Sequence, residues 1–531
     1  MVDIPSDKGV HAKTAGAKGE KYVYKYVRYF RNENGEPRNQ AKAIGKVAST
    51  PGKMYPNANY FEMYHTDSVL PDVSIWNYGY TYLIQKTCRD IGLTDCLSNI
   101  FGKSSSDILV MAAYMLEQGS IMDGIDDWQI RHYFPENQRL LTSQSTSNIF
   151  SRITQRQRQD FFKQWVSKGY AGGSVCYDVT SISSYSEQMP TVERGYNRDG
   201  EDLAQYNLGM FCDESTRTPL YYNRYNGSLT DRTNLSYVLE NAKSVGIHRV
   251  KMILDGGFWS PECFASLQNS CDAFTVGMPM FLKESENILR EQGAGIEKYV
   301  NEVRGHRLYS VSVEKEIHGV SGRVLLYYSA WNHANQCEEL SALLGRLDTE
   351  LRTLKRYPKS KLKKYTPYFR LTKHQTDSGF DYCVDVDTIE KLRETKGYFL
   401  LFTTDKSASA AEILDAYRAK DADEKIFSQL KVDMDGNRIR THTEETTDGK
   451  TFVTFVACVI RAHLLSCLSD YLTDQSTSMK KVFNQLSNIT ILSGYNGYRF
   501  TKALTKSQKQ ILDAFDAADD IMKTVNFLQL R

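Results

Sequence analysis

The order of elements between residues 172 and 283 constrains the fold more than any other feature. Three strand-like alternating segments come first, SVCYDVTSIS, DLAQYNLGMFC and TPLYYNRYNG. A helix ending at Gly246 follows, and then a strand, RVKMILDGGF, whose apolar run stops at Asp255. A short helix from Pro261 and the strand AFTVGMP complete the series. This order predicts a mixed α/β fold, in which helices pack against a sheet.

The hydrophobic pattern divides the rest of the chain into regions of different character. We expect a mobile N-terminus (1–20), a basic β-hairpin lobe (21–70) and a helical region (71–170). An α/β core follows in two parts (171–283 and 397–450), with an insertion subdomain between them (284–396) and a helical C-terminal region at the end (451–531). A helix from about Ser407 to Val432 follows the strand GYFLLFTTD.

Two N-terminal regions have alternative interpretations. Residues 1–50 carry ten Lys/Arg and five Asp/Glu, and their hairpin with a turn at Asn34-Gly35 interleaves lysines and tyrosines. Such a hairpin suits a phosphate backbone, or it is a solvated lobe whose lysines protect a sheet edge. The helical region 71–170 is either a DNA-binding module or a plain bundle with a charged outer face.

Composition and charge exclude several classes of protein. The 531 residues contain 41% apolar and 24% charged side chains, as in an ordinary folded protein. The 66 Lys+Arg against 64 Asp+Glu give +2, which argues against a polybasic tail. The N-terminus lacks the apolar segment of a signal peptide, and Phe452–Leu468, interrupted by Arg461 and His463, is typical of a core helix. The ten scattered cysteines indicate a reduced, cytoplasmic chain with no membrane partner.

Two aspartates within these strands are candidate catalytic residues. Asp178 lies inside a strand between Tyr177 and Val179, and Asp255 ends a later strand. A carboxylate within a buried strand is costly unless it is paired or binds a cation. Each one alone is also explained as a cap of the next turn.

A third group of polar residues shares one helical stripe. Tyr417, Lys420, Glu424 and Lys431 lie at offsets of 3, 7 and 14, within roughly 60° of one another on an ideal helix. A solvated amphipathic face explains the charges, but it explains neither the tyrosine nor the two strand aspartates.

These segments together resemble a family. Tyr417-x2-Lys420-x3-Glu424-x6-Lys431 is similar to the Tyr-x2-Arg-x3-Glu-x6-Lys signature of bacterial insertion-sequence transposases, which are DDE enzymes with a ribonuclease H-like core. YDVTS around Asp178 and ILDGGF around Asp255 resemble the first and second motifs, and GYNRDGEDLAQYNLG the second-strand region. Two positions depart from the pattern, since Lys420 replaces an Arg and Gly256 stands where an Arg is frequent. Neither departure touches a carboxylate.

The resemblance implies a metal-dependent site. Asp178, Asp255 and Glu424 would hold two Mg²⁺ ions about 3.5–4 Å apart, with Mn²⁺ as a substitute. Asp178 would bridge both ions. Tyr417, Lys420 and Lys431 would contact the DNA backbone near the cut.

The insertion carries an acid-free basic stretch. Its nine cations lie between residues 352 and 373, interleaved with four aromatic residues, and suit phosphates and unstacked bases unless they are simply a solvated face. They are Arg352, Lys355, Arg356, Lys359, Lys361, Lys363, Lys364, Arg370 and Lys373, with Tyr357, Tyr365, Tyr368 and Phe369 among them. By its position Trp331 is a candidate for stabilising a flipped base, as in related transposases, although a core tryptophan is the plainer interpretation.

The expected function is therefore DNA transposition. We expect metal-dependent cleavage at the terminal inverted repeats, strand transfer into target DNA, and a homodimer in the synaptic complex, in a nucleoid-associated bacterial protein. One alternative is a catalytically silent, domesticated DNA-binding protein, which would not need all three carboxylates. Another is a structure-specific or RNA–DNA nuclease on the same fold.

Overall fold

The computed structural model describes the chain except residues 16–19, 33–34, 65–73, 138, 249, 375–378, 495–496 and 529–531. It describes the backbone but not the side chains of 421–424, 493–494, 497 and 526–528. The chain forms two compact units. The first comprises Met1–Trp76, Thr490–Ala503 and Asp520–Arg531, and the second comprises Asn77–Ile489 and Leu504–Asp519.

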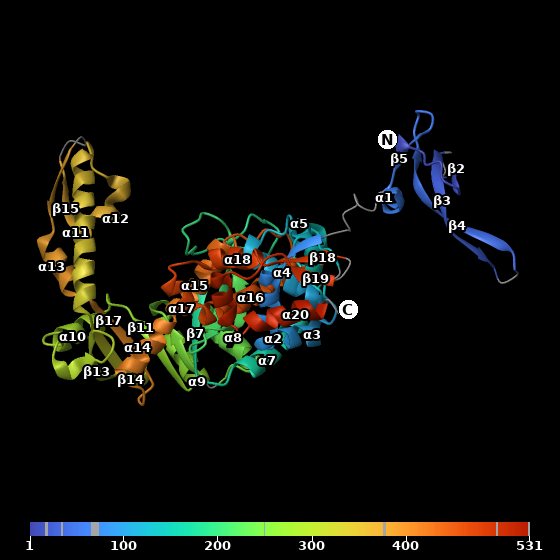
Figure 1. The fold of residues 1–531 in the computed structure, drawn as a ribbon. Helices are drawn as coiled ribbons and strands as arrows, with labels where there is room; N and C mark the ends of the chain where they lie inside the picture. Colours follow the sequence, from blue (N-terminus) through green and yellow to red (C-terminus); the bar gives the residue numbers. More distant parts are fainter. Residues whose placement is uncertain are drawn as a thin grey trace. The chain divides into compact units, whose positions relative to one another are not determined.

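The N-terminal residues form an antiparallel sheet of order β1-β5-β4-β3-β2 (Figure 1). Its elements are β1 (Val2–Asp3), β2 (Val10–Ala15), β3 (Glu20–Arg31), β4 (Pro37–Val47) and β5 (Lys53–Pro56), followed by α1 (Ala58–Tyr64). The predicted hairpin is β3–β4, and Asn34 of its turn lies outside the described residues. Within the segment 1–20, which the sequence predicts to be mobile, residues 10–15 form β2 and pair with β3, and residues 16–19 lie outside the description. Val23, Ile44, Met54 and Tyr60 form the core of this sheet.

Helices occupy most of the next hundred residues, as the periodicity predicts. They are α2 (Gly79–Asp90), α3 (Leu93–Phe101), α4 (Ser104–Gln118), α5 (Ile125–Ile130), α6 (Ser143–Arg152) and α7 (Gln155–Gly169). Thr142 and Thr154 begin α6 and α7 with capping boxes, which satisfy the free backbone N–H groups of the first turn. A short strand, β6 (Ser74–Asn77), precedes them and joins the sheet β19-β18-β6.

The central sheet has a ribonuclease H-like core. Its five strands are β7 (Ser174–Ser183), β8 (Gln205–Asp213), β9 (Pro219–Asn226), β10 (Lys251–Leu254) and β11 (Ala273–Met278). They lie in the order β9-β8-β7-β10-β11, with β7, β8 and β9 antiparallel and β7, β10 and β11 parallel. Helix α8 (Asp231–Ser244) connects β9 to β10, and α9 (Pro261–Ser270) connects β10 to β11. This mixed α/β core is the one predicted from the sequence.

The sheet extends beyond these five strands because β17 (Tyr398–Thr403), from the second part of the core, pairs with the edge of β11, and strands of the insertion continue beyond it. Strand β17 lies antiparallel between β11 and β14 (Val320–Tyr328), and β13 (Leu308–Ile317) and β12 (Glu302–Val303) follow. Pairing with β17 removes the exposed edge that β11 would otherwise present. Helix α10 (Lys283–Gln292) precedes these strands.

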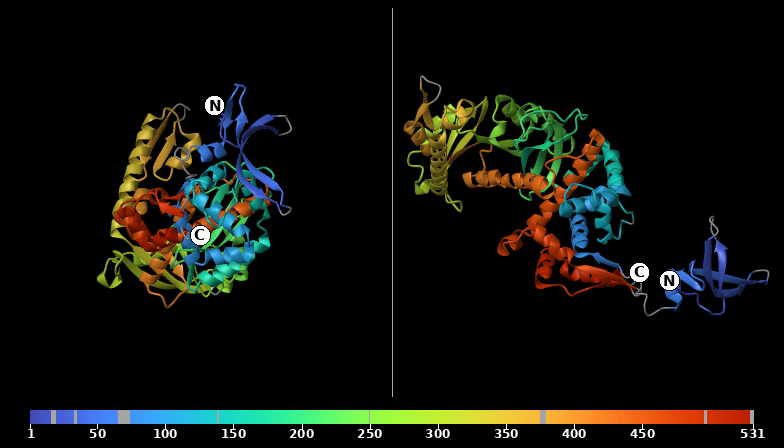
Figure 2. Two further views of the ribbon diagram at one scale, coloured as in Figure 1. Left: turned by 45° about the vertical axis from the view of Figure 1, so that its right-hand side comes forward. Right: turned by 90° about the horizontal axis from the view of Figure 1, so that it is seen from above.

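The long helix α11 (Ala330–Thr353) leaves this sheet, and the remainder of the insertion packs along it (Figures 1 and 2). That remainder consists of η3 (Lys359–Lys361), α12 (Leu362–Tyr365), β15 (Phe369–Lys373), β16 (Phe380–Val384) and α13 (Val386–Glu394). Leu347 and Leu351 of α11 form a core with Tyr365 and Phe369. We call this outer part of the insertion, residues 347–384, the tip.

The single helix expected from Ser407 to Val432 is three helical segments. They are α14 (Ala410–Ala419), α15 (Asp421–Ser428) and the π-helix η4 (Gln429–Asp433), with Lys420 at the junction of the first two. Helix α16 (Glu444–Cys467) is long and apolar enough to cross a membrane, but 78% of its apolar window is buried inside the protein. It is the core helix that the sequence predicts, and it begins earlier than expected.

The C-terminal region is helical with one hairpin. Its helices are α17 (Ser469–Asp474), α18 (Met479–Ser487), α19 (Lys506–Asp513) and α20 (Ala518–Leu528). Between α18 and α19 the chain forms β18 (Thr490–Gly494) and β19 (Gly497–Phe500), which pair antiparallel.

Candidate active site

The strand register brings Asp178 and Asp255 to the same level of the sheet. Parallel pairing joins Lys251 to Ser174 and Ile253 to Cys176, so its continuation sets residue 255 opposite residue 178. Level residues on neighbouring strands lie about 5 Å apart and point to the same face. Extended by two residues past the last pair, this register predicts that the two aspartates share one face and one edge of the core.

Asp255 is held by the turn that follows its strand. Asp255 caps the single turn η1 (Gly256–Phe258). Its Oδ1 accepts a hydrogen bond of 2.9 Å from the backbone N–H of Gly257. Gly256 lies close to the backbone of β11, because a Cβ at this position would be 3.1 Å from the carbonyl oxygen of Gly277. The glycine that departs from the family motif thus allows the close approach of two chain segments.

Lys420 forms an ion pair with Asp178. Its Nζ lies 3.9 Å from Oδ2 of Asp178, and the two side chains are 5% and 15% exposed. A buried carboxylate needs a compensating charge, and Lys420 supplies one. We expected Lys420 to contact DNA. In this structure it faces the sheet instead, and its contact with DNA stays a prediction.

Helices α14 and α15 carry the third motif across the sheet. Helix α15, which contains Glu424, packs against β7, and α14 packs against β10. The Oη of Tyr417 lies next to Gly277 of β11, where a Cβ would come within 2.5 Å of it. The backbone of Glu424 is thus on the helix that covers Asp178, while its side chain lies outside the description.

Lys431 belongs to the π-helix and binds an acidic loop. Its Nζ donates hydrogen bonds of 2.7 and 2.6 Å to the two carboxylate oxygens of Asp199. A π-helix has more residues per turn than an α-helix, so the stripe projected at 100° per residue does not continue unchanged to Lys431. The loop between β7 and β8 is its partner in this structure.

The same loop supplies a residue that the motif search did not single out. Arg198 donates a hydrogen bond of 3.1 Å to Ser181 on β7 and forms an ion pair with Asp231 at the start of α8. Burial lowers the pKa of Arg198, but Asp231, and to a smaller extent Asp178, outweigh this and raise it overall. The GYNRDGED segment was recognised as a family feature, yet nothing in its sequence shows that its arginine points inward.

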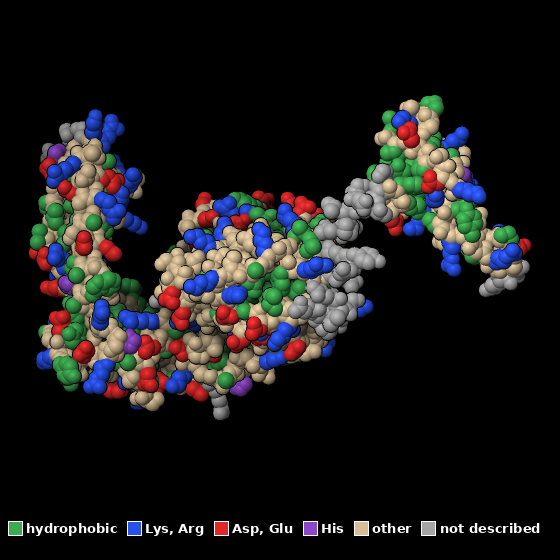
Figure 3. Space-filling view, in the orientation of Figure 1, with side chains coloured by type: hydrophobic (Ala, Val, Ile, Leu, Met, Phe, Trp, Pro, Cys, Tyr) green, Lys and Arg blue, Asp and Glu red, His purple; other side chains and the backbone are tan. Residues whose placement is uncertain are grey.

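The basic stretch of the insertion divides into paired and exposed cations. Arg352 forms an ion pair with Asp348, Lys364 with Glu350, and Arg370 with Asp385. Five further cations between residues 355 and 363 are exposed and have no ion pair within the described part of the chain. They are Lys355, Arg356, Lys359, Lys361 and Lys363. Figure 3 shows Lys and Arg side chains gathered over the tip.

The aromatic residues among these cations have a structural role. Tyr365 and Phe369 are 0% and 2% exposed, inside the core of the tip. The interpretation that they stack on bases is therefore wrong for these two residues. Trp331, in contrast, is 72% exposed in the first turn of α11, so the interpretation of it as a core tryptophan is wrong as well.

The chemistry of Asp178 and Asp255 suits a hard divalent cation, because carboxylate oxygens are the ligands that Mg²⁺ prefers. Within the side chains that the structure describes, no three His, Cys, Asp or Glu gather at one point. The third member of the expected set, Glu424, is not among them. The three-carboxylate site therefore stays a prediction, and the register of β7 and β10 is consistent with a common position for two of its members.

Comparison with known proteins decides the family. Residues 172–460, more than half of the chain, match the family model of the transposase DDE domain. The chain belongs to this family. The matched range of the transposase begins just before β7 and ends within α16, so it contains the core sheet, the insertion and the helices of the third motif.

Two further comparisons complete the picture of this transposase. None of the curated proteins matches its sequence. Among solved structures, it is similar to a piggyBac transposase in a synaptic complex with hairpin DNA, at 12% sequence identity and a TM-score of 0.32, over 84% of this chain and 75% of that one.

Proposed function

We propose that this transposase cuts DNA at the ends of its element and joins the freed 3′ ends to target DNA by a metal-dependent DDE mechanism. The observation that carries the proposal is the shared level of Asp178 and Asp255 on adjacent parallel strands, with α15 packed over β7. We further propose that it belongs to the insertion-sequence group with the Tyr-x2-Arg-x3-Glu-x6-Lys motif, here with Lys420 in place of the Arg.

In this proposal Asp178, Asp255 and Glu424 hold the divalent cations. When bound, two Mg²⁺ or Mn²⁺ ions would activate the attacking water or 3′-OH and relieve charge on the scissile phosphate. Asp178 and Asp255 are held in place by the sheet register and by the hydrogen bond from Gly257. Lys420 offsets the negative charge of Asp178 from inside the protein, which favours a preformed site.

The proposed partner is double-stranded DNA, namely the terminal inverted repeats and the target. The five exposed cations of the tip are suited to phosphates, since each contact releases a counterion and adds about 0.9 to the salt dependence. Trp331 has the exposure that stacking on an unpaired base requires. Tyr417 and Lys431 are proposed to hold the backbone near the cut, Lys431 after it exchanges Asp199 for a phosphate. Synapsis of two ends would need a homodimer.

The test uses purified protein, Mg²⁺ or Mn²⁺, and DNA that carries the terminal repeats. The unmodified protein should cut at the ends, while Asp178→Asn and Asp255→Asn should bind the same DNA and leave it uncut. Asp272→Asn is a matched control, because this exposed carboxylate lies before β11 at the opposite end of the strand. It should cut normally.

Two outcomes would favour other functions. Binding without cutting by the unmodified protein would favour a silent, domesticated DNA-binding protein. Cutting that is indifferent to the terminal repeats would favour a general nuclease.

A further inference from the structure

A lysine inside the core helix has no direct ion pair, although the carboxylate of Asp435 acts on it from a distance. Lys450 of α16 is 4% exposed, and its amine has no hydrogen bond or ion pair with any residue that the structure describes. Other buried cations are paired, such as Arg224 with Glu444 and Arg461 with Asp433. Burial lowers the pKa of Lys450 to about 8, so the amine is still mostly protonated at neutral pH. An unpaired buried charge is costly, which calls for an anion at this place.

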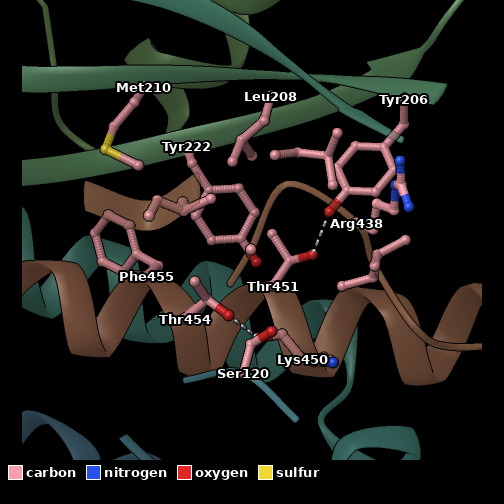
Figure 4. A pocket seen from close by; sticks show the side chains of 14 residues that line it. Ser120, Tyr206, Leu208, Met210, Tyr222, Arg438, Lys450, Thr451, Thr454 and Phe455 are labelled. Atoms are coloured by element: carbon pink, nitrogen blue, oxygen red, sulfur yellow. Dashed lines mark hydrogen bonds between the residues drawn. The ribbon is translucent and has the colours of Figure 1, made fainter. Parts of the chain in front are cut away.

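Lys450 also lines a second cavity, whose walls are partly polar. In Figure 4 the amine points away from the apolar space between Tyr206 and Tyr222. This second cavity has a volume of about 310 Å³ and lies between α6 and the segment that leads into α16. This cavity is large enough for a small oxyanion with water around it.

The walls of the cavity combine apolar side chains with several hydrogen-bond donors and the positive charge of Arg440. Arg440 and His442 come from the segment before α16, and Ser143 and Ser147 from one face of α6. Neither serine hydroxyl has a hydrogen-bond partner in the described part of the protein. Hydroxyl and guanidinium groups suit the oxygens of a phosphate.

Two acidic groups face this region. Asp123 lies exposed at the rim, and Asp435 is engaged by Arg440 Nη1 at 2.8 Å. The ion pair with Arg440 therefore partly neutralises the negative charge of Asp435. Asp123 is the one carboxylate among the described residues that line the cavity.

We propose that this cavity binds a phosphate group, with Lys450 as its buried cation, Arg440 at its rim, and Ser143 and Ser147 as hydroxyl donors. The site is separate from the proposed catalytic residues, none of which lines the cavity. The phosphate is either one of the DNA backbone, in which case the inference rests on the proposed function, or a free phosphate ion. Two arms of the test distinguish these sources.

The first arm uses inorganic phosphate and the full-length protein in a phosphate-free buffer. Calorimetric titration should show saturable binding that Lys450→Met weakens at least tenfold. Ser147→Asp, a half-buried position on α6, should weaken it similarly by placing a negative charge at the mouth, and it serves if Lys450→Met does not fold. Lys509→Met, an exposed lysine of α19, is the control and should leave binding unchanged. Absence of phosphate binding, or equal binding by Lys450→Met and Ser147→Asp, overturns the proposal.

The second arm measures binding of a short DNA duplex over a range of salt concentrations. If the site takes a backbone phosphate, Ser147→Asp should weaken duplex binding and lower the salt slope by about 1, and inorganic phosphate should compete. If it takes free phosphate, duplex binding should be unchanged by Ser147→Asp while the first arm still shows specific binding. Neither arm depends on cleavage, so failure of the catalytic proposal would be seen separately.

Discussion

Replacing Lys450 by Met should stabilise the second unit when no phosphate is present. The pKa of Lys450 falls from its ordinary value of 10.5 to about 8 in the folded protein. At about 1.4 kcal/mol per pH unit, this difference corresponds to a cost of about 3 kcal/mol at pH 7, where the amine is charged in both the folded and the unfolded chain. Methionine has a similar length and no charge, so the variant should gain most of this free energy.

The pH dependence of this gain has a definite sign. Between pH 8 and 10.5 the unfolded chain binds more protons at this position than the folded one, so the unmodified protein becomes more stable as the pH rises. The advantage of Lys450→Met should therefore be full below pH 8 and fade toward pH 10.5. Urea unfolding at pH 7 and pH 10, followed by fluorescence of the buried Trp128 and Trp165, measures both values. A variant no more stable than the parent at pH 7, or an advantage that does not change with pH, would refute the reasoning.

Three further variants test other parts of the structure. Arg224→Leu should lower the free energy of unfolding by about 3–5 kcal/mol in urea titrations, because Glu444 loses its ion pair and Asp448 keeps only the one with Arg158; a loss below 1 kcal/mol would contradict this. Gly209→Ala should cost about 1–3 kcal/mol by the same measurement, since its Cβ would lie 2.2 Å from the buried hydroxyl of Tyr177, and an unchanged stability would show that the contact is not this close. Trp331→Ala should change the free energy of unfolding by less than about 0.5 kcal/mol, because the side chain is exposed. It should weaken binding to nicked or unpaired element ends about 5- to 150-fold by loss of stacking. Equal binding of the variant and the parent, measured by fluorescence anisotropy of the DNA, would remove Trp331 from the proposed site.

The core strands were predictable because their signals are local. Apolar alternation around Asp178 and the stop at Asp255 define two strands without reference to their neighbours. The partner of β17 could not be predicted in this way. Its apolar run suits any buried position in a sheet, and the choice of β11 and β14 as neighbours depends on contacts far apart in the sequence.

The candidate site was predicted in residue type more than in geometry. An ideal helix set Tyr417, Lys420 and Lys431 on one stripe, whereas the structure interrupts the helix at Lys420 and ends it in a π-helix. Lys420 consequently faces Asp178 from inside the protein. Lys450 was overlooked because it precedes the apolar run from which the core helix was predicted, and only the start of α16 at Glu444 brings it into the interior.

The position of β17 limits which segments of the chain can be exchanged between related transposases. Since β17 pairs with β11 on one side and with β14 on the other, the insertion strands β12, β13 and β14 belong to the same sheet as the core. They cannot be replaced without breaking backbone hydrogen bonds of that sheet. An exchange of the outer part of the insertion should therefore begin at Ser329, before α11, and end at Thr395, after α13, so that the pairing of β14 with β17 is kept.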